Sequence, residues 1–151
     1  YLGRLDFQVF ATDGHFRELG GLGRISPETG FAPGWKLRSV EAADKEGGRD
    51  TAPVAEMLQR VATRLLQTGR LVIATDADAQ GEAIGWHLLQ VLRESPYWKY
   101  VREIVRVRFN EISQTAIKAA FANPDRVITV PDEAAEAVLD QGLLARAVAL
   151  E

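Results

Sequence analysis

Three carboxylates within seven residues form the segment of this chain most suited to chemistry, DADAQGE at residues 76–82. The segment follows an apolar run, Leu71–Thr75, that is typical of a buried strand, and precedes a helical pattern. At an extended strand end, Asp76 and Asp78 project to the same side and repel by about 1 kcal/mol in water and about 4 kcal/mol near a protein surface. A divalent cation would reverse that repulsion, and Mg²⁺ suits one or two carboxylates completed by water and substrate phosphate. Gly81 is expected to leave room for a phosphate-bearing ligand to approach the backbone.

The same acids also fit a purely structural role. The helix dipole favours acidic residues in the first turn of a helix by about 0.3–1 kcal/mol each, and either Asp76 or Asp78 could be the N-cap. A cap explains one aspartate but not two, so a metal site and a helix cap both stay open for this pair. Glu82 is more typical of a first-turn acid than of a direct metal ligand.

The surrounding pattern alternates strands with helices. The expected strands cover residues 6–12, 71–75, 104–109 and 127–130. The expected helices run from Asp50 or Thr51 to Gly69, over 79–92, onward from Ser113, and over 132–148 with Gly142 as a candidate break. This order predicts an α/β layer structure with a mainly parallel central sheet flanked by helices. Ligand chemistry in such sheets lies beyond the carboxyl ends of the strands.

Composition narrows the class of protein. The chain has 151 residues, a net charge of −3, no cysteine and two histidines. Without cysteine there is no disulfide, thiol nucleophile or cysteine-ligated metal, so any metal should be a hard cation held by oxygen. No apolar run approaches the roughly 18 residues that a spanning helix needs, so we expect no membrane partner and a cytoplasmic location. The acidic balance argues against a general nucleic-acid-coating protein but allows a local basic face.

We expect residues 1–149 to form one domain. Seven of the 13 glycines fall between residues 20 and 48, which predicts a loop-rich insertion over 20–50. Residues 150–151 are treated as a candidate cloning remnant. The segment GGLGR offers backbone N–H groups but matches no phosphate-binding motif, so we interpret it as a loop.

Four segments in a fixed order resemble one family. The string ATDADAQGEAIGWHLL is similar to the metal-binding turn of Toprim domains in type IA DNA topoisomerases, which usually reads close to A-T-D-x-D-R-E-G-E-A-I-x-W-H. The other segments are LDFQVFATDGHFREL, GFAPGWKL and VRVRFNEISQTAIKAAFANP, and together the four span about residues 2 to 126. The resemblance implies a Toprim-like, Rossmann-like fold in which Asp76 and Asp78 are Mg²⁺ ligands and Glu82 closes the motif. It also implies that His15 and Glu111 lie near the same strand ends. The residues that it implies to be catalytic are Asp76, Asp78, Glu82 and His15.

Two departures from the family pattern bear on activity. The family's Arg-Glu pair is Ala79-Gln80 here, so a phosphate-contacting cation and a third acidic ligand are both missing and we expect weaker cation binding. The family's opening strand, with its glutamate and lysine, has no counterpart in this sequence. None of Tyr1, Tyr97 and Tyr100 matches the context of the DNA-cleaving tyrosine, which belongs to a separate domain. The isolated chain is therefore expected not to break DNA.

The resemblance implies part of an ATP-independent isomerase that passes DNA through a transient single-strand break, with Mg²⁺ positioning backbone phosphates. The partners it implies are a single-stranded DNA segment at the nucleoid and the remaining domains of the parent enzyme. The alternative is a Toprim-derived module that docks DNA or a neighbouring domain without metal chemistry, which Ala79 and Gln80 favour. Another Mg²⁺-dependent Toprim enzyme, such as a primase or nuclease, ranks below the first.

The remaining polar residues each have a functional and a structural interpretation. Arg106 and Arg108 share one face of the strand expected at 104–109, where they would either contact DNA phosphates or form an ordinary solvated face. His15 stands at a strand end, yet a lone histidine is more often a packed or orienting side chain. His87 falls on the apolar stripe of its helix, and we interpret it as a buried, hydrogen-bonded structural residue.

Overall fold

The computed structural model describes residues 7–12, 14–20, 34–38 and 54–149. The elements of these ranges are, in order, β1 (Arg17–Leu19), β2 (Trp35–Leu37), α1 (Val54–Thr68), β3 (Arg70–Asp76), α2 (Ala79–Glu94), the short 3-10 helix η3 (Trp98–Tyr100), β4 (Glu103–Phe109), α3 (Gln114–Ala122), β5 (Arg126–Thr129) and α4 (Glu133–Ala149). The predicted alternation of helices and strands is confirmed from α1 onward. The helix caps expected at Asp50 or Thr51, and all but the first residue of the GGLGR segment at 20–24, lie outside the described residues.

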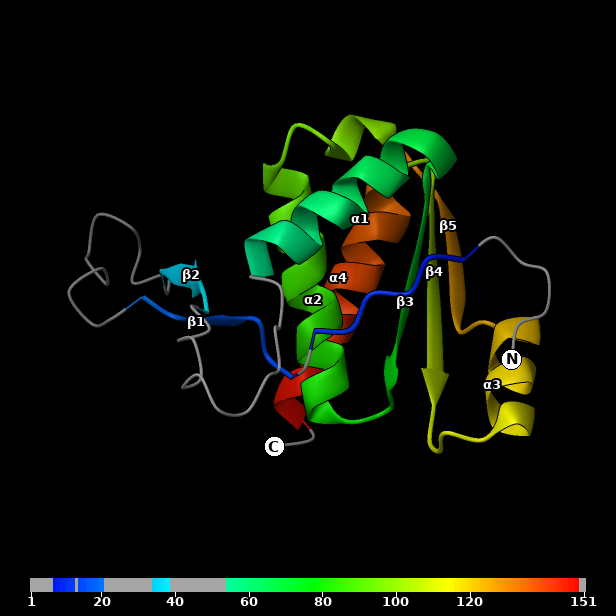
Figure 1. The fold of residues 1–151 in the computed structure, drawn as a ribbon. Coiled ribbons are helices and arrows are strands. Elements are labelled where there is room, and N and C mark those ends of the chain that lie inside the picture. The colour runs from blue at the N-terminus through cyan, green and yellow to red at the C-terminus, as the bar shows by residue number, and fades with distance from the viewer. Residues whose placement is uncertain (1–6, 13, 21–33, 39–53, 150–151) are drawn as a thin grey trace, which may run out of the picture.

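Strands β3, β4 and β5 form the central sheet, with β4 in the middle. β3 and β4 run parallel, from Arg70 opposite Glu103 to Asp76 opposite Phe109, whereas β5 is antiparallel to β4. The described sheet is therefore mixed, and the expectation of a mainly parallel sheet holds only for the β3–β4 pair. Strand β5 is antiparallel because α3 lies near the carboxyl end of β4, as Figure 1 shows. The chain therefore enters β5 from that end of the sheet, without the crossover to the opposite end that a parallel strand needs.

Figure 1 shows the sheet nearly edge-on, with α1, α2 and α4 on one side and α3 on the other. The main core lies between the sheet and the helices α2 and α4, and its buried members include Leu71, Ile73, Leu89, Leu92, Ile104, Ile128, Leu139 and Leu143. A second cluster joins Phe16 to Val54 and Leu58 of α1. None of the helices in the described ranges combines the length and the apolar character needed to cross a bilayer.

Two sequence expectations about the elements are wrong. The sequence predicts a strand over residues 6–12, but the described residues 7–12 form neither a strand nor a helix. Phe7 packs edge-on against Phe121 of α3, with ring centroids 5.6 Å apart, so side-chain packing rather than sheet pairing holds this segment. Gly142 does not break α4, because Leu139 and Leu143 are buried on the same helix and hold it against the core.

Helix α2 is covered on two sides, which fixes its position relative to β3. Its sheet-facing side is formed by Glu82, Gly85, Leu89 and Leu92, all buried. Gly85 permits the close approach, because a Cβ at this position would lie 3.1 Å from Cγ2 of Ile73 and 3.5 Å from Cδ2 of Leu143. On another side of the helix, Ile84, Leu88 and Val91 pack against the second cluster around Phe16, and Leu88 also contacts the main core. The amino end of α2 is thereby held at the carboxyl end of β3.

Candidate metal centre and its supporting ion pairs

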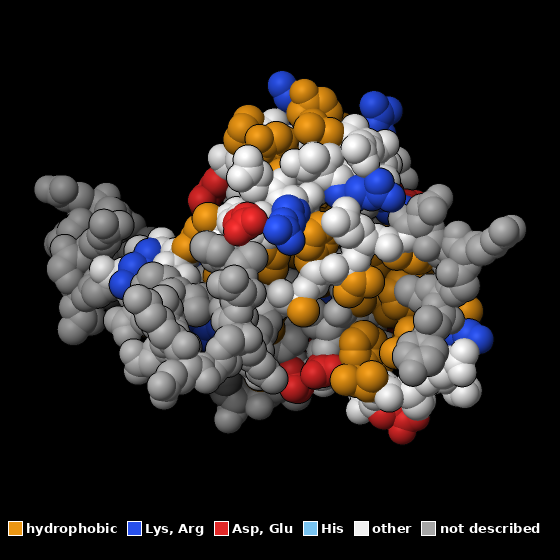
Figure 2. All heavy atoms as spheres, in the orientation of Figure 1, with side chains coloured by type: hydrophobic (Ala, Val, Ile, Leu, Met, Phe, Trp, Pro, Cys, Tyr) orange, Lys and Arg blue, Asp and Glu red, His pale blue; other side chains and the backbone are white. Residues whose placement is uncertain are grey.

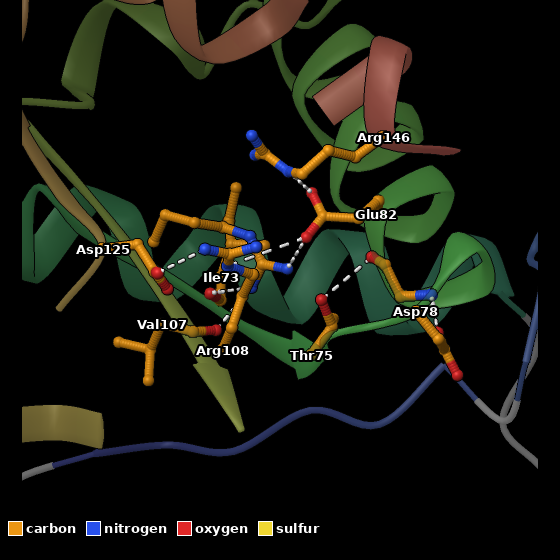
Figure 3. A network of polar contacts seen from close by, with 10 residues as sticks. Ile73, Thr75, Asp78, Glu82, Val107, Arg108, Asp125 and Arg146 are labelled. Atoms are coloured by element: carbon orange, nitrogen blue, oxygen red, sulfur yellow. Dashed lines mark hydrogen bonds and ion pairs between the residues drawn. The ribbon is translucent and has the colours of Figure 1, made fainter. Parts of the chain in front are cut away.

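The turn between β3 and α2 carries both candidate metal ligands. Asp76 is the last residue of β3, and Asp78 is the N-cap of α2, with Oδ1 accepting a 2.7 Å hydrogen bond from the Gly81 N–H. From the strand side, the hydroxyl of Thr75 donates a 2.9 Å bond to the carbonyl of Gly81. Figure 3 shows these two bonds joining the strand end to the first helical turn. Of the two aspartates, Asp78 and not Asp76 is therefore the N-cap of α2.

Asp76 and Asp78 both keep carboxylate oxygens at the surface. Asp76 is exposed and, within the part of the chain that the structure describes, its side chain has no recorded hydrogen bond or ion pair. Asp78 is also exposed, and its described bond uses only Oδ1. Acidic side chains reach the surface along the lower edge of the molecule in Figure 2, where β3 and β4 end. Capping and cation binding therefore do not exclude one another at this turn.

Gly81 makes room for the protein's own backbone. It is buried, and a Cβ at this position would lie 2.2 Å from the carbonyl oxygen of Asp76 and 3.0 Å from its N and C atoms. Only a glycine allows the helix and the strand end to approach this closely. The expectation that Gly81 leaves room for a phosphate-bearing ligand is wrong, because the end of β3 already fills that space.

Glu82 is fully buried behind the turn, with 0% of its surface exposed. Its Oε1 accepts a 2.9 Å bond from Nη2 of Arg106 on β4, and its Oε2 accepts a 3.1 Å bond from Nε of Arg146 on α4. The Nε of Arg108 lies 4.0 Å from Oε1. Figure 3 shows this carboxylate between side chains of two other elements. Glu82 is thus the first-turn acid that its position in the sequence predicts, and it ties α2 to β4 and α4; that it is also a catalytic residue stays a prediction.

Arg106 is 1% exposed, so the expectation that it contacts DNA or lies on a solvated face is wrong. Helices α2 and α4 cover this face of β4. Besides Glu82, Arg106 donates from Nη1 to the carbonyls of Ile73, at 3.1 Å, and Val107. Burial lowers the pKa of Arg106, and the neighbouring Glu82 opposes that shift. An arginine with these partners keeps its charge at neutral pH.

Arg108 is the more accessible of the two arginines, with 34% of its side chain exposed. Its Nη2 donates a 2.7 Å bond to Oδ1 of Asp125. That hydrogen bond lowers the pKa of Asp125, so the carboxylate stays ionised. Arg108 is therefore the one of the pair whose position suits contact with an external phosphate.

His15 is exposed and lies between the bend at Gly14 and strand β1. Its neighbour Gly14 has φ +87°, and a Cβ there would lie 3.3 Å from Nε2 of Gln80. Glu111 is exposed just beyond β4, whose last residue pairs with Asp76, and it accepts a 2.7 Å bond from the Ser113 hydroxyl. The structure thus brings Gly14, the residue before His15, and Glu111 to the same end of the sheet as the two aspartates.

His87 is buried among aromatic rings. The ring centroids of Trp35, Trp86 and Phe16 lie 4.4, 5.0 and 6.4 Å from that of His87. Its predicted burial is confirmed, but the expected hydrogen bond is absent at Nδ1, which has no partner among the described residues. Burial, together with the charges of Arg17 and His15, lowers the pKa of His87 to about 4. The ring is therefore neutral at pH 7 and holds β2 against α2.

The donor set at the turn fits a loosely held hard cation. Two surface carboxylates with the amide of Gln80 nearby suit Mg²⁺, which commonly takes one or two carboxylates and completes its shell with water and phosphate. No cluster of three or more His, Asp or Glu side chains able to enclose a metal occurs in the described ranges. The turn thus fits an open Mg²⁺ site and not a closed protein cage.

Sequence reasoning missed the ion pairs that support the turn, and it missed Arg146 altogether. A local signal existed on β4, where Arg106 and Arg108 share a face with Ile104, a residue type that is usually buried. For Arg146 the signal was its position on the same helix as the apolar Leu139 and Leu143, near the buried side of α4.

The comparison with known proteins agrees with this geometry. The family model described as the Toprim domain matches residues 1–112, so the chain belongs to the Toprim domain family. Proteins named DNA topoisomerase 1 are similar to it: the one from Mycoplasmoides gallisepticum is 31% identical over 131 residues, that from Zymomonas mobilis 33% over 125, and that from Rickettsia prowazekii 35% over 130. These alignments cover 81%, 82% and 85% of this chain but only 18%, 9% and 15% of the relatives. The chain therefore spans less than a fifth of the relatives' length.

Proposed function

We propose that this chain is the Toprim portion of a type IA DNA topoisomerase. The parent enzyme would break and reseal one DNA strand through a tyrosine of another domain. The observation that carries the proposal is the pair of exposed aspartates, Asp76 and Asp78, in the turn from a parallel strand into a helix. A Rossmann-like layering of the complete domain, over residues 1–149, is part of the same proposal.

Asp76 and Asp78 would hold Mg²⁺, with the neutral amide oxygen of Gln80 as the next nearest donor. When bound, the ion would supply positive charge beside the backbone phosphates at the break and the resealing step. The chain's own contribution is placement. The Gly81 N–H fixes one oxygen of Asp78, and the buried Glu82 holds the helix that carries it.

His15 and Arg108 would complete the surroundings of the site. The backbone of Gly14, the residue before His15, lies against the side chain of Gln80, which supports a role for the imidazole beside the acidic turn. Arg108, on the strand next to Asp76, would contact a DNA phosphate. Within this chain no side chain is assigned as the nucleophile, so we expect the isolated chain to bind DNA without cleaving it.

The proposed partners are a single-stranded DNA segment and the other domains of the parent enzyme, in the cytoplasm at the nucleoid. Support comes from the relatives, which are named DNA topoisomerase 1 and are more than five times as long as the aligned segment.

Calorimetry with Mg²⁺ and Mn²⁺ tests the metal site. Asp76→Asn/Asp78→Asn should abolish binding while keeping the fold, because asparagine caps a helix about as well as aspartate. Glu111→Gln is the matched control, since it removes an exposed acid from the same end of the sheet and should leave most binding intact. Equal binding by the double variant and the unchanged chain would refute the metal assignment.

A second candidate function is a docking module without metal chemistry. It is favoured by Ala79 and Gln80, which stand where the family has arginine and glutamate, and by the engagement of Asp78 as a helix cap. Ala79→Arg/Gln80→Glu in the full-length protein separates the two functions. A topoisomerase should gain Mg²⁺-dependent relaxation of supercoiled DNA, whereas a docking module should gain none.

A further inference from the structure

We propose that Arg146 and Arg108 together form an anion subsite at the rim of the buried Glu82 cluster, and that it takes a backbone phosphate of single-stranded DNA. The choice of DNA as the source of the phosphate rests on the proposed function. Arg146 is the new element, because it lies on α4, beyond the residues matched by the Toprim family.

The cluster carries an excess of positive charge. Arg106, Arg108 and Arg146 all lie within 4.0 Å of the Glu82 carboxylate, and the second carboxylate in contact with them is Asp125. Three guanidinium groups thus face two carboxylates. Arg106 is buried, and both of its terminal nitrogens donate hydrogen bonds, to Glu82 and to backbone carbonyls. The excess positive charge therefore lies at the two partly exposed arginines, Arg108 and Arg146, which we call the rim arginines.

The rim arginines have donors to spare. Arg146 is 39% exposed and uses Nε for Glu82, while its Nη1 and Nη2 make no recorded hydrogen bond within the described chain. Its guanidinium lies over Gly142, where a Cβ would stand 3.2 Å from Nη1. Arg108 is 34% exposed; its Nη2 donates to Asp125 and its Nε is buried, so its spare donor for an external ligand is Nη1. A guanidinium with free N–H groups in a planar fork is the side chain best suited to phosphate oxygens.

The position of the subsite matches a DNA strand that passes the acidic turn. Arg108 pairs in register with Thr75, one residue before Asp76. Glu82, which both rim arginines approach, lies in the first turn of the helix that Asp78 caps. A DNA strand with one phosphate at the metal would therefore have another phosphate within reach of Arg108 and Arg146. The contribution of these two arginines to DNA affinity would not depend on the metal.

The test measures binding of a labelled oligothymidylate to the intact chain by fluorescence anisotropy in EDTA, so that metal at the aspartates contributes nothing. Arg146→Gln should weaken binding by roughly 3- to 10-fold at low salt and reduce the slope of log affinity against log salt by about 0.7, the value of one phosphate contact on a single strand. Arg146→Lys keeps the charge and should keep most of the affinity.

Arg93→Gln is the matched control. Arg93 also joins α2 to α4, through Asp140 at 3.0 Å and Glu136 at 3.9 Å, but it lies in the last turn of α2, away from the acidic turn. It should bind DNA as the unchanged chain does. If Arg146→Gln gives the same affinity and salt slope as Arg93→Gln, the subsite is overturned.

A measurement on the unchanged chain covers the case in which Arg146→Gln does not fold. Labelling by an arginine-selective dicarbonyl, followed by peptide mass spectrometry, should be slowed at Arg146 and Arg108 by the oligonucleotide and unaffected at the exposed Arg60. Protection by inorganic phosphate but not by DNA would overturn DNA as the ligand. None of these binding and labelling experiments contains metal. They therefore test the arginine subsite even if Asp76 and Asp78 turn out not to bind Mg²⁺.

Discussion

The carbonyl oxygen of Asp76 lies 2.2 Å from the point at which a Cβ of Gly81 would stand. The first turn of α2 therefore rests directly on the last peptide of β3, with no side chain between them. The hydrogen bonds of Thr75 and Asp78 to the Gly81 peptide close the same junction from both sides. The position of the two aspartates is thus set by a backbone contact.

Gly81→Ala should push α2 away from β3. Overpacking of this kind typically costs about 1–3 kcal/mol of the free energy of unfolding, and the shift of Asp76 should weaken Mn²⁺ binding as well. Urea unfolding and Mn²⁺ titration measure the two effects. Gly142→Ala is the control, because its Cβ would meet only the flexible end of Arg146. Equal stability of the two variants would contradict the backbone contact.

Substitutions of Asp78 should separate capping from cation binding. Asp78→Asn keeps an oxygen for the Gly81 N–H, so the free energy of unfolding should change by less than about 0.5 kcal/mol while Mg²⁺ affinity falls. Asp78→Ala loses both functions and should cost about 1 kcal/mol of stability in addition. Thermal unfolding and calorimetry on the same samples provide both numbers. A fully stable Asp78→Ala would show that the capping bond contributes nothing.

Glu82→Gln should destabilise the chain far more than a surface substitution. Removing the negative charge leaves the buried Arg106 without its counter-ion, and breaking a buried pair in this way costs about 3 kcal/mol or more. Glu56→Gln is the matched control, since Glu56 pairs with Arg60 at 3.0 Å on the exposed side of α1 and should cost less than about 0.5 kcal/mol. Urea unfolding at pH 7 decides the matter, and similar losses in both variants would refute the buried network.

His87 should make stability depend on pH between about 4 and 6.5. Its pKa is lowered to about 4 in the folded chain from an unfolded value of 6.5, so in this window the unfolded chain binds the extra proton. Stability from this residue is complete above about pH 6.5 and falls as the pH drops, by on the order of 3 kcal/mol at pH 4.

Urea unfolding at several pH values checks the His87 prediction. His87→Phe keeps an aromatic ring beside Trp35 and removes the titrating group, so its stability should decline less steeply below pH 6.5. His15→Gln removes an exposed charge that opposes protonation of His87, so its stability should fall slightly less steeply with falling pH than that of the unchanged chain, but more steeply than that of His87→Phe. Parallel curves for His87→Phe and the unchanged chain would rule out His87 as the source of the acid sensitivity.

Much of the fold could be predicted because its signals are local. Gly69, with φ +64°, ends α1 where the sequence places a helix stop, and Ser113 caps α3 through a 3.1 Å bond from the Ala116 N–H. Apolar runs likewise identify β3, and alternation identifies β4. The antiparallel direction of β5 could not be predicted, because it depends on where α3 lies relative to the sheet. That position is set by tertiary packing and leaves no signal in the local sequence.

The candidate site was predictable only at the surface. Spacing alone puts Asp76 and Asp78 together in a turn after a strand. The partners of Glu82 could not be predicted, because alternation along β4 assigns Arg106 to one face but does not say what covers that face. Here the covering element includes α4, whose Arg146 lies 64 positions from Glu82 in the sequence.

Helix α4 has a practical consequence for any attempt to excise this unit. The matched family region stops at residue 112, yet Leu139, Leu143 and Ala147 of α4 are buried and Arg146 binds Glu82. A fragment trimmed at the family boundary would leave the inner face of α2 uncovered and strip Glu82 of one counter-ion. Expression boundaries for biochemical work should therefore extend past Ala147.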